Sequence, residues 1–425
     1  MSYFHSVTLD ESKCRGCTNC IKRCPTEAIR VRDGKAKIIK VRCIDCGECI
    51  RVCPYHAKRA VTDSFDELEK YKYNVALPAP ALYGQFAEVN DINVILTGLK
   101  KIGFDDVFEV ARGAEYISDA TKKICKNGDR PVISSACPAV IRLIRVRFPN
   151  LIDKIIDLIS PMEAAGQLAR KEAAKKTGLS DEEIGVFFIT PCPAKMTSIR
   201  SPLSLDKSSI SGAISVNDVF AKIYPILGEI KPEPLMKASM NGVYWSRSGG
   251  EADSTGIENY IAVDGIENVI KILEEIEDDK VSDIDFIELS ACLGGCVGGV
   301  LNVVNGFVAK NKIKSISKSV SKVPHECGED ISLNCSKKLE YAPVMELDDD
   351  FDKAMEMMDK LEDICDSLPG LDCGSCGAPS CRALAEDIVR GFADESFCII
   401  NMKAMLQNMP SETPTDTKAE NSDKE

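Results

Sequence analysis

An internal repeat limits what the first sixty residues can become. Four cysteines and a proline follow the spacing C-x2-C-x2-C-x3-C-P, which begins at Cys14 and again 29 positions later at Cys43. Cysteines at these spacings hold [4Fe–4S] cubes, and the fourth cysteine of each run binds the cube of the other run. The repeat therefore predicts a first cube on Cys14, Cys17, Cys20 and Cys53, and a second cube on Cys43, Cys46, Cys49 and Cys24.

Zinc is the alternative metal for these cysteines. A structural zinc site takes four ligands in paired C-x2-C knuckles, which would leave the third cysteine and the Cys-Pro of each run without a role. We therefore favour the cubes. The repeat resembles the two-cluster bacterial ferredoxins, and the resemblance implies a small α+β domain over residues 1–60.

Three short segments far apart in the chain supply four more cysteines. They are SSACPA at 134–139, TPCPAK at 190–195 and SACLGGCVGG at 290–299. Their glycines and prolines allow close backbone approach, and four thiolates suffice for one cube. The alternative is that these are unrelated core cysteines. We favour a shared site on Cys137, Cys192, Cys292 and Cys296.

A fourth cysteine group lies near the end of the chain, with the spacing C-x2-C-x4-C-x16-C and a predicted helix over 382–391. It predicts a further cube on Cys373, Cys376, Cys381 and Cys398. Residues 409–425 are polar, without apolar periodicity, and are expected to be disordered. Four cysteines have no assigned role and are expected to be ordinary core or surface thiols: Cys125, Cys327, Cys335 and Cys365.

Short apolar runs alternate with helical patterns between these motifs, which predicts an α/β core with largely parallel sheets. We expect strands at 75–77, 106–110, 131–133, 184–189 and 285–289, and helices at 92–101 and 161–177. The three central cysteine segments follow strand ends, where open α/β sheets place their sites. The predicted domains are a ferredoxin-like domain (1–60), a linker with an entry strand (61–78), a central domain (79–345), a helical cluster domain (346–408) and the tail.

Composition indicates the compartment and the partners. Twenty cysteines without a signal peptide or long apolar run predict a reducing cytoplasm and no membrane insertion. From Tyr341 onward the chain has 7 basic and 20 acidic residues, whereas residues 1–60 have 13 basic and 6 acidic ones. These opposite charges predict docking surfaces. Nucleic-acid binding is less favoured because no recognition helix or aromatic platform accompanies the basic residues.

Two further classes of site receive no support. No GxGxxG motif follows a strand, which argues against NAD and flavin. The three histidines, His5, His56 and His325, are isolated in the sequence and are expected in surface or loop roles.

The three central segments resemble the signatures of the [FeFe]-hydrogenase H-cluster domain, usually written TSCCPxW, MPCxxKxxE and ExMACxGGCxxGGG. The resemblance covers roughly residues 1–345. It implies a two-lobed domain in which a [4Fe–4S] cube shares one cysteine with a two-iron subsite carrying CO, cyanide and a dithiolate bridge. Three additional [4Fe–4S] clusters would then carry electrons. The implied reaction is H2 ⇌ 2H⁺ + 2e⁻, and the implied partners are ferredoxin or a signalling protein and the hydrogenase maturation factors.

Carried over by position, the resemblance gives roles to single residues. Cys137, Cys192 and Cys292 match cube ligands, Cys296 matches the shared bridging ligand, and Lys195 matches the lysine that pairs with a cyanide. An ammonium suits that role as a compact donor. Further residues expected around the cofactor are Ser134, Thr190, Pro191, Ser290, Gly294 and Gly295.

The departures from the family pattern concern proton transfer. Ala136 stands where catalytic members have a proton-passing cysteine, and Arg112 stands where one relay carboxylate is usual. Glu115 and Ser160 match the remaining relay groups. Loss of proton carriers slows general acid–base delivery, so the resemblance favours a slow, H2-sensing hydrogenase.

Two alternatives stay open from sequence. One is a metabolic hydrogenase linked to ferredoxin, whose basic N-terminal end would suit an acidic carrier. The other is a hydrogenase-like scaffold or electron-transfer protein without the two-iron subsite.

Overall fold

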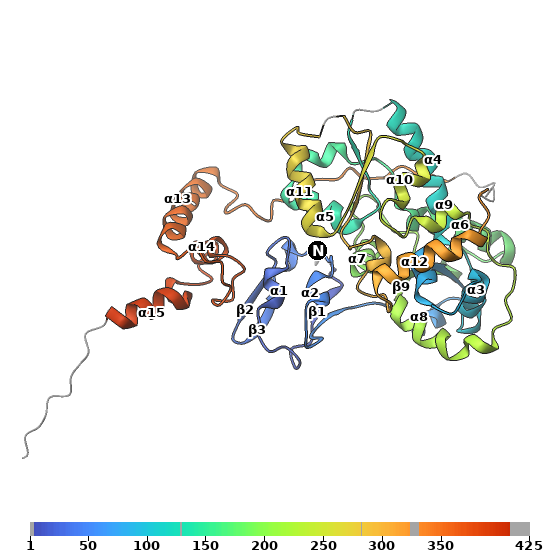
Figure 1. Cartoon of the computed structure of the whole chain (residues 1–425), viewed down its shortest axis with the longest axis horizontal. Coiled ribbons are helices and arrows are strands. Elements are labelled where there is room, and N and C mark those ends of the chain that lie inside the picture. The colour runs from blue at the N-terminus through green and yellow to red at the C-terminus, as the bar shows by residue number, and fades with distance from the viewer. Residues whose placement is uncertain (1–3, 128–129, 282, 324–330, 409–425) are drawn as a thin grey trace, which may run out of the picture. The chain divides into compact units, whose positions relative to one another are not determined.

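The computed structural model describes residues 4–127, 130–281, 283–323 and 331–408. It separates into two compact units, with the boundary between Met345 and Glu346 (Figure 1). The predicted disordered tail, together with Cys327 and His325, lies outside the described residues.

The N-terminal part is an α+β fold built around the cysteine repeat. Strand β1 (Val7–Leu9) pairs antiparallel with β4 (Lys58–Ala60), and β2 (Ile29–Arg32) pairs antiparallel with β3 (Lys35–Ile38). Helices α1 (Asn19–Lys22) and α2 (Glu48–Arg51) each follow the second cysteine of a motif, and η1 (Lys40–Arg42) precedes the second motif. The predicted ferredoxin-like region is confirmed.

A four-stranded parallel sheet forms the first lobe of the central part, in the order β6-β5-β8-β9. Its strands are β5 (Tyr73–Pro78), β6 (Asp106–Val107), β8 (Ile184–Thr190) and β9 (Gly212–Ser215). Along β8, Phe187 and Ile189 pack into one core while Val186 and Phe188 pack into another. Helices α3 (Ile92–Lys101), α8 (Val216–Ile223) and α12 (Gly306–Ile316) contribute to the first core, and α6 (Pro161–Thr177) contributes to the second.

A three-stranded parallel sheet forms the second lobe, in the order β10-β11-β7. Its strands are β7 (Val132–Ile133), β10 (Tyr260–Asp264) and β11 (Phe286–Ser290). Ile287 and Leu289 pack with α5 (Pro138–Arg147) and α11 (Ile266–Glu277), whereas Phe286 packs with α4 (Val110–Asn127) and α10 (Gly250–Thr255). Sheets covered on both faces are typical of parallel α/β folds, and the predicted α/β class is confirmed.

The first unit contains further elements. They are α7 (Pro193–Arg200), α9 (Met240–Tyr244), and the 3-10 turns η2 (Phe65–Lys70), η3 (Pro80–Gln85), η4 (Pro149–Lys154), η5 (Asp181–Glu183), η6 (Tyr224–Glu229), η7 (Cys296–Gly298) and η8 (Ser317–Ser319). The helices expected at 92–101 and 161–177 are present with these bounds. The strand expected at 106–110 ends at Val107, since α4 already begins at Val110.

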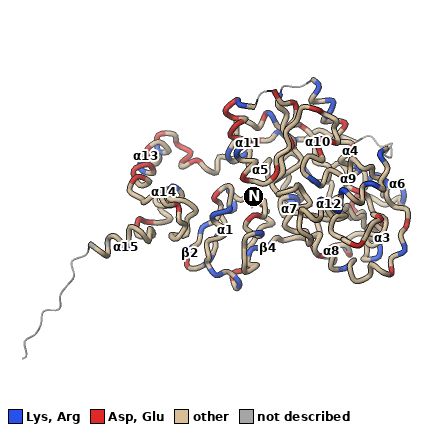
Figure 2. Tube along the Cα trace, in the orientation of Figure 1, with Lys and Arg blue, Asp and Glu red and all other residues tan. Residues whose placement is uncertain are grey.

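The C-terminal unit is helical over its described residues. It contains α13 (Phe351–Ser367), α14 (Cys381–Val389), η9 (Glu395–Phe397) and α15 (Ile399–Asn408). Leu361, Leu368, Leu384 and Cys398 form its small core. Acidic residues recur along α13, where they appear as red bands in Figure 2. No helix among the described residues of the chain is long and apolar enough to span a membrane.

Candidate functional site

The three central cysteine segments meet at one cavity of about 90 Å³. Each segment follows the carboxyl end of a parallel strand, β7, β8 or β11, which is where such sheets place their sites. All four predicted ligands line the cavity, namely Cys137, Cys192, Cys292 and Cys296. The site therefore draws cysteines from both lobes.

Two of these cysteines cap helices. Cys137 is the N-cap of α5 and Cys192 is the N-cap of α7, and a proline occupies the first helical position after each. Proline suits that position because its missing N–H has no helical partner there. The helix N-terminus favours a nearby negative charge, so both positions suit thiolates.

Burial makes the free thiols hard to ionise. It raises the pKa of Cys192 to about 12, against the opposing effect of the Lys195 ammonium. The pKa of Cys292 rises well above its usual range, first by burial and then by the neighbouring cysteines. Because a bound metal ion supplies the positive charge that such thiolates need, the donor set fits a metal cluster.

Glycines let the third segment pass against the other backbones. A Cβ on Gly299 would lie 2.3 Å from the Pro191 carbonyl oxygen, and one on Gly295 would lie 2.6 Å from the Ser248 nitrogen. Neither approach is possible for a residue with a side chain. This close fit brings Cys296 to the cavity wall.

Lys195 is buried at the cavity with 9% of its surface exposed. Its Nζ donates to the Ala136 carbonyl oxygen at 3.3 Å and lies 5.9 Å from the centre of the Phe188 ring. The ammonium and the Ala136 methyl group therefore border the same space.

The predicted cofactor-binding residues divide into two sets. Pro191, Ser290 and Gly295 line the cavity. Ser134, Thr190 and Gly294 are not part of its described lining. The Thr190 hydroxyl accepts a bond from the Cys192 nitrogen at 3.2 Å and donates to the Cys192 carbonyl at 2.8 Å, so it shapes the turn that carries this cysteine.

A pair of buried glutamates borders the cavity, and sequence reasoning did not predict the pair. The Ser134 hydroxyl donates to the Glu251 carboxyl group at 2.7 and 2.8 Å. Glu288 accepts bonds from the Gly249 and Ala252 nitrogens at 2.9 and 3.0 Å. The available signals were Glu288 within the otherwise apolar run 286–289 and the segment 246–251, which resembles a Gly-Gly segment that borders the pocket in the family.

The environment of these two carboxyl groups raises the pKa of each one well above its usual range. Burial and the charge of Glu288 raise the pKa of Glu251 to about 8. Burial raises the pKa of Glu288 to about 7, against the bonds from two backbone nitrogens. Two close carboxyl groups resist holding two charges, so burial and mutual repulsion both favour keeping a proton on the pair.

The predicted relay residues Glu115 and Ser160 are not in the described lining of this cavity, and neither is Arg112, which stands where a further relay carboxylate is usual. Ser160 lines a neighbouring cavity together with Ala136 and Lys195. The Glu115 carboxylate accepts a bond from the Ser239 nitrogen at 2.6 Å. Arg112 pairs with Glu172 at 2.7 Å, and Ser160 caps α6 by accepting from the Glu163 nitrogen.

The ferredoxin-like region contacts the central site through its second motif. Cys46 packs against the same hydrophobic core as Cys137 and Cys192. The Arg51 guanidinium donates to the Gly298 carbonyl at 2.7 Å, next to the segment that carries Cys296. The second predicted cube therefore lies on the side of the region that faces the cavity.

The C-terminal cysteines gather in their own unit. Cys376, Cys381 and Cys398 pack around its core, while Cys373 is exposed. The Cys381 nitrogen donates to the Asp372 carboxylate at 2.6 Å.

The cysteines and histidines without predicted ligand roles take different places. Cys125 is buried in a core of the second lobe, and Cys335 and Cys365 are partly buried. His5, expected at the surface or in a loop, is buried with Nδ1 3.0 Å from Asp45.

Comparison with known proteins identifies the family. The model described as "Iron only hydrogenase large subunit, C-terminal domain" matches residues 72–256 and 236–300, more than half of the chain. The chain belongs to the iron-only hydrogenase family. A 4Fe-4S dicluster domain matches residues 6–54, and an Fe-S cluster family matches residues 368–400. The predicted resemblance to [FeFe]-hydrogenases is thus confirmed at the level of the family, and iron–sulfur cofactors are supported.

Two hydrogenases from other bacteria are similar to this chain in sequence. It is 32% identical over 214 residues to the periplasmic [Fe] hydrogenase large subunit of Nitratidesulfovibrio vulgaris, covering 45% of this chain and 50% of the relative. It is 26% identical over 220 residues to iron hydrogenase 1 of Clostridium pasteurianum, covering 45% of this chain and 38% of the relative. The matches thus span half or less of these relatives' length.

Solved [FeFe]-hydrogenases also align with this structure. A variant of HydA1 from Chlamydomonas reinhardtii aligns with a TM-score of 0.47 and 15% identity, covering 62% of this chain and 90% of that chain.

Proposed function

We propose that this protein is a slow [FeFe]-hydrogenase that reports H2. The observation that carries the proposal is the cavity that four partly buried cysteines, Lys195 and Ala136 line together. A scaffold or electron-transfer protein would need the cysteines alone. The buried ammonium supports a further ligand of negative charge beside the cube.

The residues present fit the cofactor of the family. Cys137, Cys192 and Cys292 would hold the cube, and Cys296 would be shared with the two-iron subsite. The buried thiols, the helix N-caps and the glycines at the cavity wall support this assignment. When bound, the two-iron subsite supplies the metal chemistry that interconverts H2 with protons and electrons.

The chain's own residues then have three tasks. Lys195 offers an ammonium donor at the cavity. The apolar wall, which includes Met162 and Phe188, keeps bulk water away. Glu251 and Glu288 hold a proton at the cavity edge, which offsets in part the thiol that Ala136 lacks.

Slow turnover favours the sensory alternative over the metabolic one. Ala136 cannot exchange a proton, and Arg112 is committed to Glu172. We propose that the output leaves through the iron–sulfur motif of the C-terminal unit, whose acidic surface suits a redox or signalling partner with a basic docking face. A cytoplasmic location and a dependence on maturation factors belong to the same proposal.

Infrared spectroscopy of the protein matured in vitro tests the cofactor, and steady-state assays test the rate. We expect CO and cyanide bands, together with H2 turnover well below that of a fast hydrogenase measured in parallel. Absence of the bands in protein with all its iron–sulfur clusters would favour the scaffold alternative. Turnover equal to the fast enzyme would favour the metabolic one.

A further inference from the structure

The two halves of the cysteine repeat have the same backbone but different charges. Residues 29 positions apart share the left-handed conformation, as Gly16 (φ 64°) and Asp45 (φ 53°) do, and as Glu27 and His56 (both φ 49°) do. The halves are therefore structural copies. A difference in side chains at equivalent positions then bears on the cube that each half would hold.

Each half forms a cavity of about 20 Å³ among its predicted ligands. Three wall positions correspond between the two cavities. The first cavity has Arg15, Gly16 and Lys58, whereas the second has Ile44, Asp45 and Ile29. Cations thus border the first cavity, and a carboxylate borders the second.

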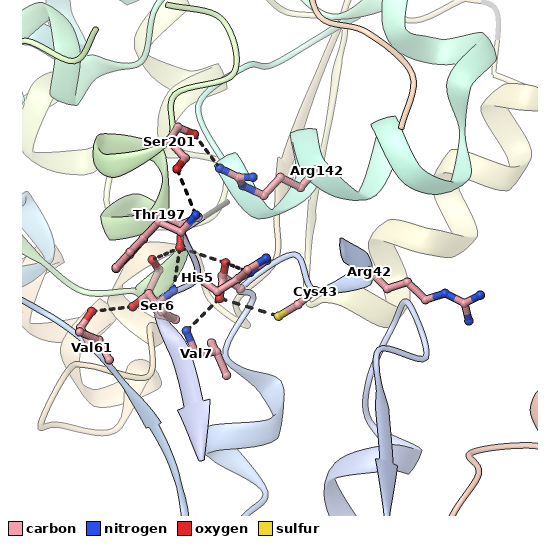
Figure 3. Close-up of polar contacts among 12 residues, drawn as sticks. His5, Ser6, Val7, Arg42, Cys43, Val61, Arg142, Thr197 and Ser201 are labelled. Atoms are coloured by element: carbon pink, nitrogen blue, oxygen red, sulfur yellow. Dashed lines mark hydrogen bonds and ion pairs between the residues drawn. The ribbon is translucent and has the colours of Figure 1, made fainter. Parts of the chain in front are cut away.

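Asp45 is buried, with 1% of its surface exposed, at a backbone position that favours glycine. Its carboxylate accepts from the Val7 nitrogen and the Thr197 hydroxyl, both at 2.9 Å, and its Oδ2 lies 3.0 Å from the His5 ring nitrogen Nδ1. The Cys43 sulfur lies 3.7 Å from Oδ1, and Figure 3 shows His5, Val7, Cys43 and Thr197 gathered around this point. These donors offset the cost of burying the charge beside a predicted cube ligand.

Lys58 carries the opposite charge and is also buried, with 2% exposed. Its Nζ has no hydrogen-bond partner among the described residues. The ammonium counteracts the effect of burial on the pKa of both Cys20 and Cys49, so its charge reaches both halves. A buried ammonium between the two halves suits anionic clusters. Because it acts on both predicted cubes, Lys58 contributes little to a difference between their potentials.

We propose that Asp45 makes the second cube the harder of the two to reduce, so that electrons pass from the second cube to the first. Reduction adds one electron to a cube, and a buried carboxylate beside it opposes the added charge. This inference rests on the proposed function, since it assumes that both motifs hold cubes and that the central site converts H2.

The order of potentials matches the spatial order of the motifs. The second motif packs against the central site through Cys46, and Cys17 of the first motif is exposed. In H2 oxidation, the two electrons of each H2 leave singly through the second and then the first cube, which are the first steps of the output route of the proposed function, toward an oxidised one-electron partner, and both protons pass to solvent. The arrangement favours H2 uptake.

Paramagnetic-resonance redox titration tests the proposal in the full chain loaded with iron–sulfur clusters but not matured. We expect the two N-terminal cubes to have different potentials. Asp45→Asn should raise the lower potential and leave the higher one nearly unchanged. Asp45→Gly, which introduces the residue found at the equivalent position of the first half, Gly16, should act in the same direction. Lys58→Met should lower both potentials.

Two controls separate charge from position. Asp33 is exposed, and its backbone is also in the left-handed conformation (φ 55°). Removing its charge by Asp33→Asn should shift neither potential. Thr197→Val removes one donor but keeps the carboxylate, and it should shift the potentials less than Asp45→Asn does.

Equal potentials in the unaltered chain would overturn the proposal, even if a variant failed to bind its clusters. A shift from Thr197→Val as large as that from Asp45→Asn would overturn the role of charge. Because no two-iron subsite and no H2 are used, failure of the proposed hydrogenase activity would leave these results intact.

Discussion

Two predicted four-cysteine sites in this chain are built in opposite ways. The central site takes its cysteines from three segments between 137 and 296 and encloses them in a cavity with Lys195. The C-terminal site takes its cysteines from one stretch, 373–398, and leaves Cys373 exposed. Enclosure suits chemistry that must exclude water, whereas exposure suits electron exchange with a partner. The same four-thiolate donor set can therefore serve two tasks, depending on what covers it.

Loss of one cysteine at each site gives the largest contrast. Cys296→Ser should reduce H2 oxidation with an artificial dye by at least about 10³-fold, because it removes the shared ligand of a reaction centre. Cys376→Ser should leave that rate within about twofold, since a dye can accept electrons without the C-terminal unit. Equal losses in dye-linked assays would show that the two sites form one catalytic system.

A buried carboxylate from each region gives the second contrast. Glu251→Gln should slow dye-linked turnover by about 10²-fold, as expected when a proton carrier is removed. Glu386, also buried, pairs with Arg390 at 2.8 Å in the C-terminal unit, and Glu386→Gln should leave turnover unchanged. An unaffected rate in Glu251→Gln would contradict the proton store at the cavity.

A thiol added at the cavity should have a smaller effect. Ala136→Cys should raise turnover by about tenfold, less than a full relay supplies, because Arg112 still lacks a carboxylate. Ala139→Cys, at the second residue of α5 and outside the cavity lining, is the control and should not increase the rate. Equal behaviour of both variants in H2 evolution assays would remove Ala136 as the cause of slow turnover.

The glutamate pair also predicts a pH dependence of stability. Its raised pKa values mean that the folded chain binds a proton more tightly than the unfolded chain does. The free energy of unfolding should therefore fall as pH rises from about 5 to about 8, by up to about 1.4 kcal/mol per pH unit for one proton. Urea unfolding of Glu251→Gln should show a flatter profile, and an unchanged slope would contradict the assignment.

The sequence predicted those parts of the fold that depend on local pattern. The run 184–189 is apolar and buried on both faces, and it became β8 almost without change. Two strands of the central part were not predicted. The strand β9 (Gly212–Ser215) has one large apolar residue, Ile214, and β10 (Tyr260–Asp264) is only partly buried along its length.

The candidate site likewise contains residues that the sequence pattern predicted and residues that only the packing revealed. Cysteine spacing brought Cys137, Cys192, Cys292 and Cys296 into one predicted site, and the structure places them at one cavity. Glu251 and Glu288 come from α10 and β11, and only the packing of those elements raises their pKa values. The turn bonds of Thr190 likewise depend on the path of the backbone, so its identity alone did not reveal its place.

The division of cysteines between two sheets has a consequence for biogenesis. Cys192 follows β8 of one lobe, while Cys137, Cys292 and Cys296 follow β7 and β11 of the other. Contacts between segments so distant in sequence form late in folding. A cluster at this site would then join two lobes that had already formed, and its binding energy would add to their association. Metallation should therefore slow amide hydrogen exchange in both sheets at once.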